Sequence, residues 1–484
     1  MNSKPFIHLY RSPRGYYLYD VNKDTIIAVS SAVYNYLDDK KSFEELSSED
    51  QCYVNELKVS GYLSSKRYSE IRHPGLDRME YELNRRCSQL ILQVTQACNL
   101  VCFYCPYANK TGGALQRDHS NKMMSWETAK AAIDFYFEHS IDCEEISISF
   151  YGGEPLIAYN LVKKCVEYAE ELFAGKKIVF NMTTNATLFT DEMIDFFYNH
   201  NFSLLFSIDG PEKIHDINRR RSDGTGSFKI AFANLRKVAE KYGDAVKDKI
   251  GINTVINPAN DADLLISLFD DKLFKEYPIN VSMTLAEDIM LEDKIEVTDL
   301  YTEKMNYQYF LGLLKALKIV EGVKLIPSVK SYVETLTKTY ASFKKNSAGL
   351  ADIGAPGGPC IPGQRRLFVN ADGDMYPCER VSEVVDVMKI GTLEKGFDFK
   401  QAAALLNVGS LTPEKCKNCY ASSKCQICGK DCISDNEFSA AEKVKHCNEV
   451  YHNFDSEILS MIVMKERRTI YKRRAADELS YLSF

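Results

Sequence analysis

The 484-residue sequence contains no run of 18 apolar residues, and therefore no segment typical of a transmembrane helix. Basic residues are not in excess either. Lys and Arg number 60 against 67 Asp and Glu, a net charge of −7 that argues against nucleic acid as the main partner. The polar start, Met1-Asn-Ser-Lys4, is not that of a signal peptide. We therefore expect a cytoplasmic protein with no membrane and no nucleic-acid partner.

Internal repeats and low-complexity tracts are also absent. Apolar residues make up 45% of the chain and aromatic residues 11%, which is ample for folded cores throughout. A chain of this length is too long for one core. From Val297 to Leu350 we expect long helices broken only by Pro327, and after Val450 a helix that packs back on the body. The predicted domains are 1–78, 88–296, 297–354, 355–450 and 451–484.

Cysteine, by contrast, is abundant and clustered. In a chain without a secretion signal, such clustering indicates metal rather than disulfides. Of the 15 cysteines, eleven fall into two groups, Cys98, Cys102 and Cys105, and then Cys360, Cys378, Cys416, Cys419, Cys425, Cys428, Cys432 and Cys447. The scattered remainder, predicted to be small buried hydrophobes, is Cys52, Cys87, Cys143 and Cys165.

The first group forms a C-x3-C-x2-C loop after an apolar run, 90–94, that reads as a buried strand. A [4Fe-4S] cube has four irons, so three thiolates leave one iron free to bind a small molecule. Zinc is the alternative, but a structural zinc site has four ligands. The next cysteine is Cys143, and the nearest histidine, His119, lies well beyond the loop. A cluster is therefore the preferred prediction.

Between Ser88 and Leu285 apolar strands alternate with helical patterns. Six βα repeats imply a parallel, curved sheet with crossover helices, in which ligands gather at the carboxyl ends of the strands. The predicted strands are 90–94, 146–151, 178–182, 203–207, 249–255 and 279–283.

The cysteine loop, with Tyr104 at the aromatic position before its third cysteine, resembles the signature of radical S-adenosylmethionine (SAM) enzymes. The resemblance implies an α/β fold with a partial (βα)6, TIM-like barrel. It also implies a [4Fe-4S] cluster held by the three cysteines of the loop, with SAM on the free iron and Tyr104 among the cofactor-binding residues.

Polar motifs follow the next three strands. In 151–155, Tyr-Gly-Gly-Glu-Pro, two glycines let the backbone approach a ligand and a carboxylate can accept from an ammonium group. By the same resemblance, the amino group of SAM is held by Gly152, Gly153 and Glu154.

The third and fourth strands end in 183–187 and 207–211. The resemblance implies that Asn185 and Ser207 contact the ribose and carboxylate regions of SAM, and that Arg219 pairs with its carboxylate. A surface position is the alternative for Arg219. His215 is expected to pack or to cap a helix.

The late cysteines resemble the SPASM extension, which carries auxiliary iron-sulfur clusters, although here an additional Cys428 intervenes. Eight thiolates could ligate two auxiliary [4Fe-4S] clusters fully, and a pair of zinc sites would meet the same count. The resemblance assigns Cys360 and Cys378 to one cluster, completed by Cys428 and Cys432. The other cluster is assigned to Cys416, Cys419, Cys425 and Cys447.

Glu379 directly follows Cys378, at a place where dehydrogenating relatives such as the anaerobic sulfatase maturases carry an aspartate general base. An ion pair between Glu379 and the neighbouring Arg380 is the alternative and the preferred interpretation.

The first domain, with short strands followed by helices, resembles the winged-helix (PqqD-like) domain of many maturases of ribosomally made peptides. A winged helix often binds DNA, but the second helical stretch here is acidic and would repel the phosphates of DNA; its acidic residues are Glu44, Glu45, Glu49 and Asp50. We therefore expect an edge strand that binds the leader of a precursor peptide. The alternative is a structural cap without a ligand.

The combination of these domains resembles the maturases that join a cysteine sulfur to a carbon of another residue, as in sactipeptides and ranthipeptides. The expected partners are a precursor peptide with a leader and an electron donor such as flavodoxin or ferredoxin. The enzymatic alternatives are a carbon-carbon crosslink and formylglycine formation on a sulfatase. A winged-helix regulator that senses iron-sulfur status also remains open, although a sensor needs no Gly-Gly-Glu-Pro turn for SAM.

Overall fold

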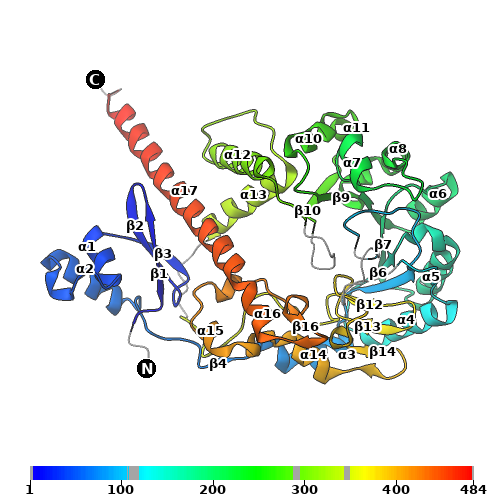
Figure 1. Cartoon of the computed structure of the whole chain (residues 1–484), viewed down its shortest axis with the longest axis horizontal. Helices are drawn as coiled ribbons and strands as arrows, with labels where there is room; N and C mark the ends of the chain where they lie inside the picture. The colour runs from blue at the N-terminus through cyan, green and yellow to red at the C-terminus, as the bar shows by residue number, and fades with distance from the viewer. Residues whose placement is uncertain (1–3, 106, 108–118, 287–294, 343–348, 482–484) are drawn as a thin grey trace.

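The computed structural model describes residues 4–105, 107, 119–286, 295–342 and 349–481. A small N-terminal unit and a large α/β unit lie at opposite ends of the molecule, with the cysteine-rich region between them (Figure 1). Helix α17 (Cys447–Tyr481) starts in the cysteine-rich region and runs past the N-terminal unit.

The N-terminal unit has the predicted order of strands followed by helices. Its antiparallel sheet has the order β1-β2-β3, so β1 and β3 are its edges. The predicted helix at 42–60 is interrupted, because Leu46 is extended and the Ser47 hydroxyl caps a new helix by accepting from Asp50 N. The elements are β1 (Ile7–Ser12), β2 (Gly15–Asp20), β3 (Thr25–Val29), α1 (Ser31–Leu37) and α2 (Ser48–Val59).

Six parallel strands form the large unit, and they lie side by side in chain order, which confirms the predicted arrangement. They are β5 (Leu90–Thr95), β6 (Glu145–Gly152), β7 (Lys177–Thr184), β8 (Phe202–Ser207), β9 (Ile250–Ile256) and β10 (Asn280–Leu285). Crossover helices cover the outer face of the sheet (Figure 1). They include α4 (Trp126–His139), α5 (Tyr159–Leu172), α6 (Asp191–Asn199) and α8 (Phe228–Tyr242).

Burial explains why these segments are strands and helices. Every residue of β5 is buried, as expected of a parallel strand covered on both faces. In α5, Val162, Cys165, Val166 and Ala169 recur at helical spacing and are fully buried, while the opposite face is polar. Each of the two valines contributes about 1.5–3 kcal/mol relative to an exposed one.

The sheet does not stop at the barrel strands. β12 (Leu367–Val369) pairs in parallel with β5, and β13 (Asp374–Tyr376), β14 (Gly391–Thr392) and β15 (Gly396–Phe397) continue it antiparallel into a ten-stranded mixed sheet. The predicted domain at 355–450 therefore shares its sheet with the barrel. Three-residue strands carry too little periodicity for the sequence to reveal this pairing.

Two long helices, α12 (Asp299–Ala316) and α13 (Pro327–Ser342), follow the barrel. Pro327 starts α13 instead of breaking a helix, as suits a residue without an N–H at the first turn. The chain reverses between the two helices through Lys318 and Gly322, which both have positive φ, 57° and 70°. The expectation that only Pro327 interrupts this segment was wrong.

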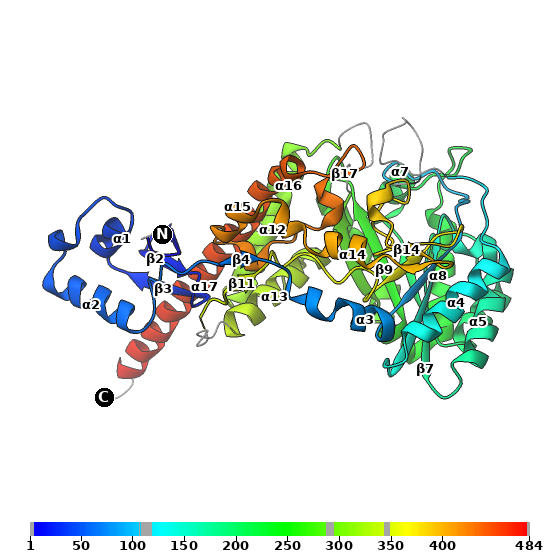
Figure 2. The ribbon, with the colours of Figure 1, turned by 90° about the horizontal axis from the view of Figure 1, so that it is seen from below.

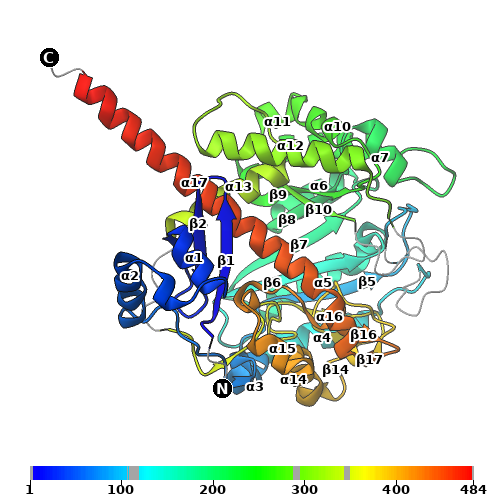
Figure 3. The ribbon, with the colours of Figure 1, turned by 60° about the vertical axis from the view of Figure 1, so that its left-hand side comes forward.

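Helix α17 crosses the predicted boundary between residues 450 and 451, since it begins at Cys447. Its first half shares an apolar core with the N-terminal unit, in which Phe454, Ile458 and Met461 meet Tyr10 and Tyr17. The predicted packing on the body is therefore present for this half. The far end projects away from the body (Figures 2 and 3).

Two of the four scattered cysteines, Cys87 and Cys165, are buried as expected, and Cys143 is partly buried. Cys52 is exposed on α2, so the prediction was wrong for that residue. Within the described parts of the chain, no helix combines the length and apolar character needed to cross a bilayer.

Candidate active site

The first cysteine group follows β5 at the carboxyl end of the sheet, where the sequence placed it. Two backbone hydrogen bonds hold the loop against the end of α7 (Glu212–Asn218) and the residues that follow it: Val101 N donates to Arg220 O at 2.7 Å and Phe103 N to Asn218 O at 3.3 Å. Cys102 is buried, and Cys98 and Cys105 are partly buried. The loop is therefore fixed by the protein itself.

The three thiols influence one another's ionisation, which indicates that they share one neighbourhood. Burial raises the pKa of Cys98 and of Cys102 to about 12, and charge on the neighbouring thiols adds to both shifts. Cys105 differs. Burial is the largest single influence and opposes its ionisation, but the hydrogen bond and charge of His119, together with the Tyr107 backbone N–H and the Arg219 charge, lower the pKa of Cys105 overall.

His119 is the residue that the sequence did not lead us to expect here. Its Nε2 lies 3.5 Å from Cys105 Sγ, and its Nδ1 lies 2.9 Å from the carbonyl oxygen of Gln96. Its ring also stacks on Tyr107. A histidine that appeared remote from the loop therefore contacts a cysteine of the loop.

The two glycines at the end of β6 allow a close approach, but to the chain's own backbone. A Cβ on Gly152 would lie 1.9 Å from Thr95 O, and one on Gly153 would lie 2.1 Å from Ala97 O. Gly153 N donates to Thr95 O, and Glu154 N to Ala97 O, both at 2.9 Å. Glycine is therefore required at both positions to hold the residues just before Cys98, and the approach of this backbone to SAM stays a prediction.

Glu154 is buried and hydrogen-bonded. Its carboxylate accepts from Leu156 N at 3.1 Å, Thr184 Oγ1 at 2.7 Å and Asn185 N at 2.7 Å. Burial raises the pKa of Glu154 to about 7, although these donors oppose the rise. A cation placed beside the carboxylate would favour its ionised form.

Asn185 follows β7 and lies beside the first cysteine. Its Nδ2 donates to Asn99 Oδ1 at 2.8 Å and lies 3.9 Å from Cys98 Sγ, while its Oδ1 accepts from Thr187 N and Oγ1. Ser207, at the end of β8, is also buried. Both predicted residues therefore lie at the same edge of the sheet as the cysteine loop, and their roles toward SAM remain predictions.

Arg219 is buried, not on the surface, and lies between a carboxylate and a cysteine. Its Nε lies 3.1 Å from Asp209 Oδ1, and its Nη1 lies 3.8 Å from Cys102 Sγ. Asp209 also accepts from Tyr104 OH at 2.6 Å. Asp209 thus orients two predicted cofactor residues. The sequence contained it in the 207–211 motif but gave no sign of its partners.

His215 has the packing role expected of it. It is fully buried, and its pKa is lowered to about 4 by burial and by the Arg219 charge. Because Nδ1 accepts from Asp209 N, the ring proton lies on Nε2, which donates to Ser227 Oγ at 3.0 Å. The neutral ring therefore fixes the loop that carries Asp209.

Comparison with known families identifies this part of the chain, since residues 92–267 match the model of the Radical SAM superfamily. These residues form a radical SAM domain. An uncharacterized protein of Methanocaldococcus jannaschii is 39% identical over 138 residues, which are 28% of this chain and 44% of that protein. The serine-type anaerobic sulfatase-maturating enzyme of Bacteroides thetaiotaomicron is 34% identical over 140 residues, 29% of this chain and 33% of that enzyme.

These two relatives are thus matched over less than half of their own length. A third, the cysteine-type anaerobic sulfatase-maturating enzyme of Clostridium perfringens, is 25% identical over 389 residues, 76% of this chain and 95% of the enzyme. The solved structure of native anSMEcpe with bound AdoMet has a TM-score of 0.55 at 19% identity and covers 77% of this chain and 99% of its own. That similarity shows a shared fold.

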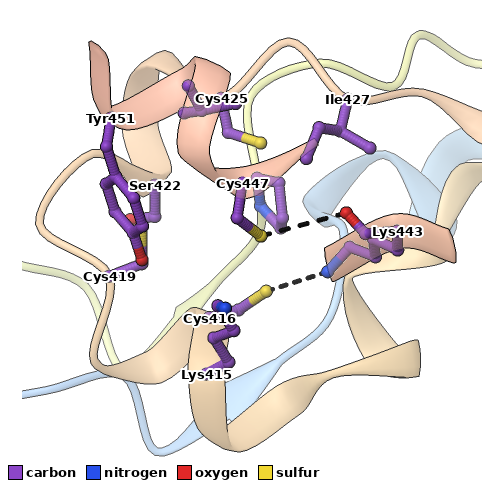
Figure 4. A pocket seen from close by; sticks show the side chains of 11 residues that line it. Lys415, Cys416, Cys419, Ser422, Cys425, Ile427, Lys443, Cys447 and Tyr451 are labelled. Carbon is purple, nitrogen blue, oxygen red and sulfur yellow. Dashed lines mark hydrogen bonds between the residues drawn. The ribbon is translucent and has the colours of Figure 1, made fainter. Parts of the chain in front are cut away.

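Beyond the radical SAM domain, four late cysteines line one pocket. Cys416, Cys419, Cys425 and Cys447 surround it together with Lys443 and Tyr451 (Figure 4). Burial raises the pKa of Cys425 to about 11 and also raises that of Cys419. These are the four residues that the SPASM resemblance assigned to a single cluster.

Three other cysteines, Cys360, Cys378 and Cys428, line a separate and much larger cavity of about 1460 Å³, here called the main cavity. Burial raises the pKa of Cys378 to about 11 and that of Cys428 to about 12. Cys432 lies deeper, fully buried beside Cys425, and its Sγ contacts the Cys428 carbonyl at 3.3 Å. Its membership of this set remains a prediction.

The donor chemistry of each cysteine set fits an iron-sulfur cluster, because thiolates are the protein ligands of such clusters. A single zinc ion requires its ligands to converge within about 2.0–2.3 Å of one point. Across the described residues, no three His, Cys, Asp or Glu side chains are arranged to hold one metal ion.

Glu379 is engaged in ion pairs. Its Oε1 accepts from Arg366 Nη1 at 2.6 Å and lies 3.8 Å from Arg380 Nε. The sequence predicted the Arg380 partner, and the structure adds Arg366 as the closer one. These contacts favour the ion-pair interpretation over a general base.

Proposed function

We propose that this chain is a radical SAM maturase that joins a cysteine sulfur to a carbon of another residue in a ribosomally made precursor peptide. The main cavity carries this proposal. Its volume of about 1460 Å³ exceeds the roughly 300–1,000 Å³ of small-molecule pockets and suits a peptide segment. Cysteines of a predicted auxiliary cluster lie in its wall, where an acceptor for an electron from the substrate would be needed.

The cavity wall is chemically divided. Leu313 of α12, Tyr332 of α13 and Phe454 of α17 contribute apolar surface, and Arg365 and Lys430 contribute charge beside the cysteines. An apolar surface with a few polar groups is the usual composition of a binding cavity. The substrate peptide would therefore lie between the two long helices and the cysteine-rich region.

Cys98, Cys102 and Cys105 would hold a [4Fe-4S] cluster, which when reduced would supply the electron that cleaves SAM to methionine and a 5′-deoxyadenosyl radical. That radical would take a hydrogen atom from a substrate carbon and become 5′-deoxyadenosine. When the carbon bonds to a cysteine sulfur, the thiol releases a proton and one electron is left over. The two auxiliary [4Fe-4S] clusters are proposed to accept that electron.

The chain's own residues have distinct roles in this proposal. Asp209 holds Tyr104 and Arg219 at the carboxyl ends of the strands, and Arg219 places positive charge beside Cys102. Glu154, at the neighbouring strand end, offers a buried carboxylate to the amino group of SAM.

Leader binding is assigned to β3 of the N-terminal unit. The sheet has two edges, and β1 lies against α17, whereas β3 is the opposite edge. An extended leader could add to β3 by main-chain hydrogen bonds, as peptides do at exposed sheet edges. The domain boundaries, the cytoplasmic location and an electron donor such as flavodoxin or ferredoxin are parts of the same proposal.

Sulfatase maturation is the second candidate, supported by the C. perfringens enzyme that the chain matches over 95% of that enzyme's length. The two reactions leave different products. A thioether removes two hydrogen atoms and consumes a thiol, whereas formylglycine formation from cysteine removes the sulfur. A carbon-carbon crosslink removes two hydrogen atoms but leaves every thiol free.

The test incubates the reduced protein and SAM in two separate reactions. One contains a cysteine-containing precursor peptide encoded beside the protein, and the other contains a sulfatase peptide. Mass spectrometry before and after thiol alkylation reads the outcome. We expect the precursor to lose two hydrogens and one alkylatable thiol. Loss of sulfur from the sulfatase peptide, or of two hydrogens with all thiols still reactive, would contradict the thioether assignment. The absence of 5′-deoxyadenosine from every reaction would favour a non-catalytic sensor.

A further inference from the structure

Lys443, on α16 (Ala440–Lys445), is a charged residue in an unusual position. Only 1% of its surface is exposed, although lysine is almost never fully buried without a partner. Its Nζ lies 3.1 Å from Cys416 Sγ, and it also donates to Thr412 Oγ1. Figure 4 shows the side chain directed into the four-cysteine pocket.

A buried ammonium group costs several kcal/mol unless an opposite charge accompanies it. Among the residues that the structure describes, none of the ion pairs formed by Asp or Glu includes Lys443. The neighbouring acids are otherwise engaged, since Glu442 pairs with Lys445 and Asp431 with Lys430. The partners of Lys443 are thus a hydroxyl and a cysteine sulfur.

Neutral thiols cannot supply the missing charge. Binding to iron changes this, because metal-bound cysteines are thiolates. Four thiolates around a [4Fe-4S] core leave a net negative charge that the ammonium group would balance.

We propose that Lys443 is the buried counter-charge of a cluster held by Cys416, Cys419, Cys425 and Cys447, and that its hydrogen bond to Cys416 raises the reduction potential of that cluster. The inference rests on the proposed auxiliary cluster at these cysteines. Lys443 is a positioning and tuning residue, since it acts through a ligand. Added negative charge on the reduced cluster is stabilised by a nearby cation, and hydrogen bonds to sulfur are among the factors that set such potentials.

The pocket offers a matched control. Lys415 lines the same pocket, but its side chain is exposed, so water and salt screen its charge. The experiment compares Lys443→Met, Lys443→Gln and Lys443→Arg with Lys415→Met in the reconstituted full-length protein. Iron content and the potentials of all clusters are measured by redox titration followed by electron paramagnetic resonance.

We expect Lys443→Met and Lys443→Gln to lower the potential of one auxiliary cluster by about 59 mV, a tenfold change in its reduction equilibrium constant. Lys443→Arg and Lys415→Met should leave it near the wild-type value. Loss of that cluster from the Met and Gln variants, with retention in the Arg variant, would equally support the counter-charge role. Retention of all iron with unchanged potentials in the Met and Gln variants would overturn it.

The outcomes separate this inference from the function on which it rests. If wild-type iron content does not fall when Cys416 and Cys419 are replaced, the auxiliary cluster itself is absent and the proposed function loses its electron acceptor. If the cluster is present but insensitive to Lys443, only the present inference fails.

Discussion

The Nε2 atom of His119 lies 3.5 Å from the Sγ of Cys105, although 14 residues separate the two in the chain. The opposite ring nitrogen contacts the Gln96 carbonyl, so the imidazole is held on both sides. Residues that hold a metal ligand by a hydrogen bond commonly tune the site without binding the metal. His119 therefore has a place in the first cysteine site that its position in the sequence did not suggest.

Replacing His119 by Leu should leave the cluster bound but slow SAM cleavage by about tenfold, because contacts of this kind are typically worth 10–100-fold. The measurement is the rate of 5′-deoxyadenosine release together with iron content. His200→Leu is the control, since His200 pairs with Glu170 at the surface. Equal rates for the two variants would show that the Cys105 contact has no role.

Asp209→Asn should destabilise the fold strongly, because it leaves the buried Arg219 without its carboxylate. Removing one partner of a buried ion pair costs about 3–5 kcal/mol. The free energy of unfolding, measured in denaturant, should fall far more than for Asp142→Asn, which breaks the exposed pair with Arg85. Similar losses in both variants would contradict the structural role of Asp209.

Glu154 predicts a pH dependence of stability. Its folded pKa, raised to about 7, lies above the value of about 4.3 expected in the unfolded chain. The folded state therefore holds a proton that the unfolded state has lost, so this stability is complete below about pH 4.3 and is lost as the pH rises through about 7. Thermal unfolding of the SAM-free protein should show this decline, and Glu154→Gln should reduce it. An identical decline in the variant would assign it to other groups.

Replacing Cys416 and Cys419 by Ala should lower iron content yet leave some SAM cleavage. The reason is that the first cysteine site follows β5, whereas these two residues lie in the separate four-cysteine pocket. Iron analysis and 5′-deoxyadenosine release test this directly. Unchanged iron per protein would contradict an auxiliary cluster in the pocket.

The barrel was predictable because short strand-like segments alternate with helical patterns along the chain, and the first strand, β5, is buried on both faces and reads as an apolar run. Residues placed at strand ends by that pattern, such as Gly152, Asn185 and Ser207, lie together with the cysteine loop. Neighbouring parallel strands bring their carboxyl ends to one edge of the sheet. The order of the strands along the chain was therefore sufficient to predict that these residues share one site.

The contacts of Lys443, His119 and Asp209 could not be predicted in the same way. Lys443 occurs in an ordinary polar helix, and its burial depends on packing against a pocket assembled from distant segments. β12 was missed because its partner, β5, lies far away in the chain. Each of these features is a long-range contact without a local pattern.

The most direct test is anaerobic incubation of the reduced, reconstituted protein with SAM, compared with a variant in which Cys98, Cys102 and Cys105 are all Ala. The assay measures 5′-deoxyadenosine and bound metals together. We predict 5′-deoxyadenosine from the wild type and none from the variant, with iron lowered by one cluster and not abolished. Bound zinc that disappears with these cysteines, or 5′-deoxyadenosine at equal rates from both proteins, would contradict the assignment of this loop as a radical SAM site.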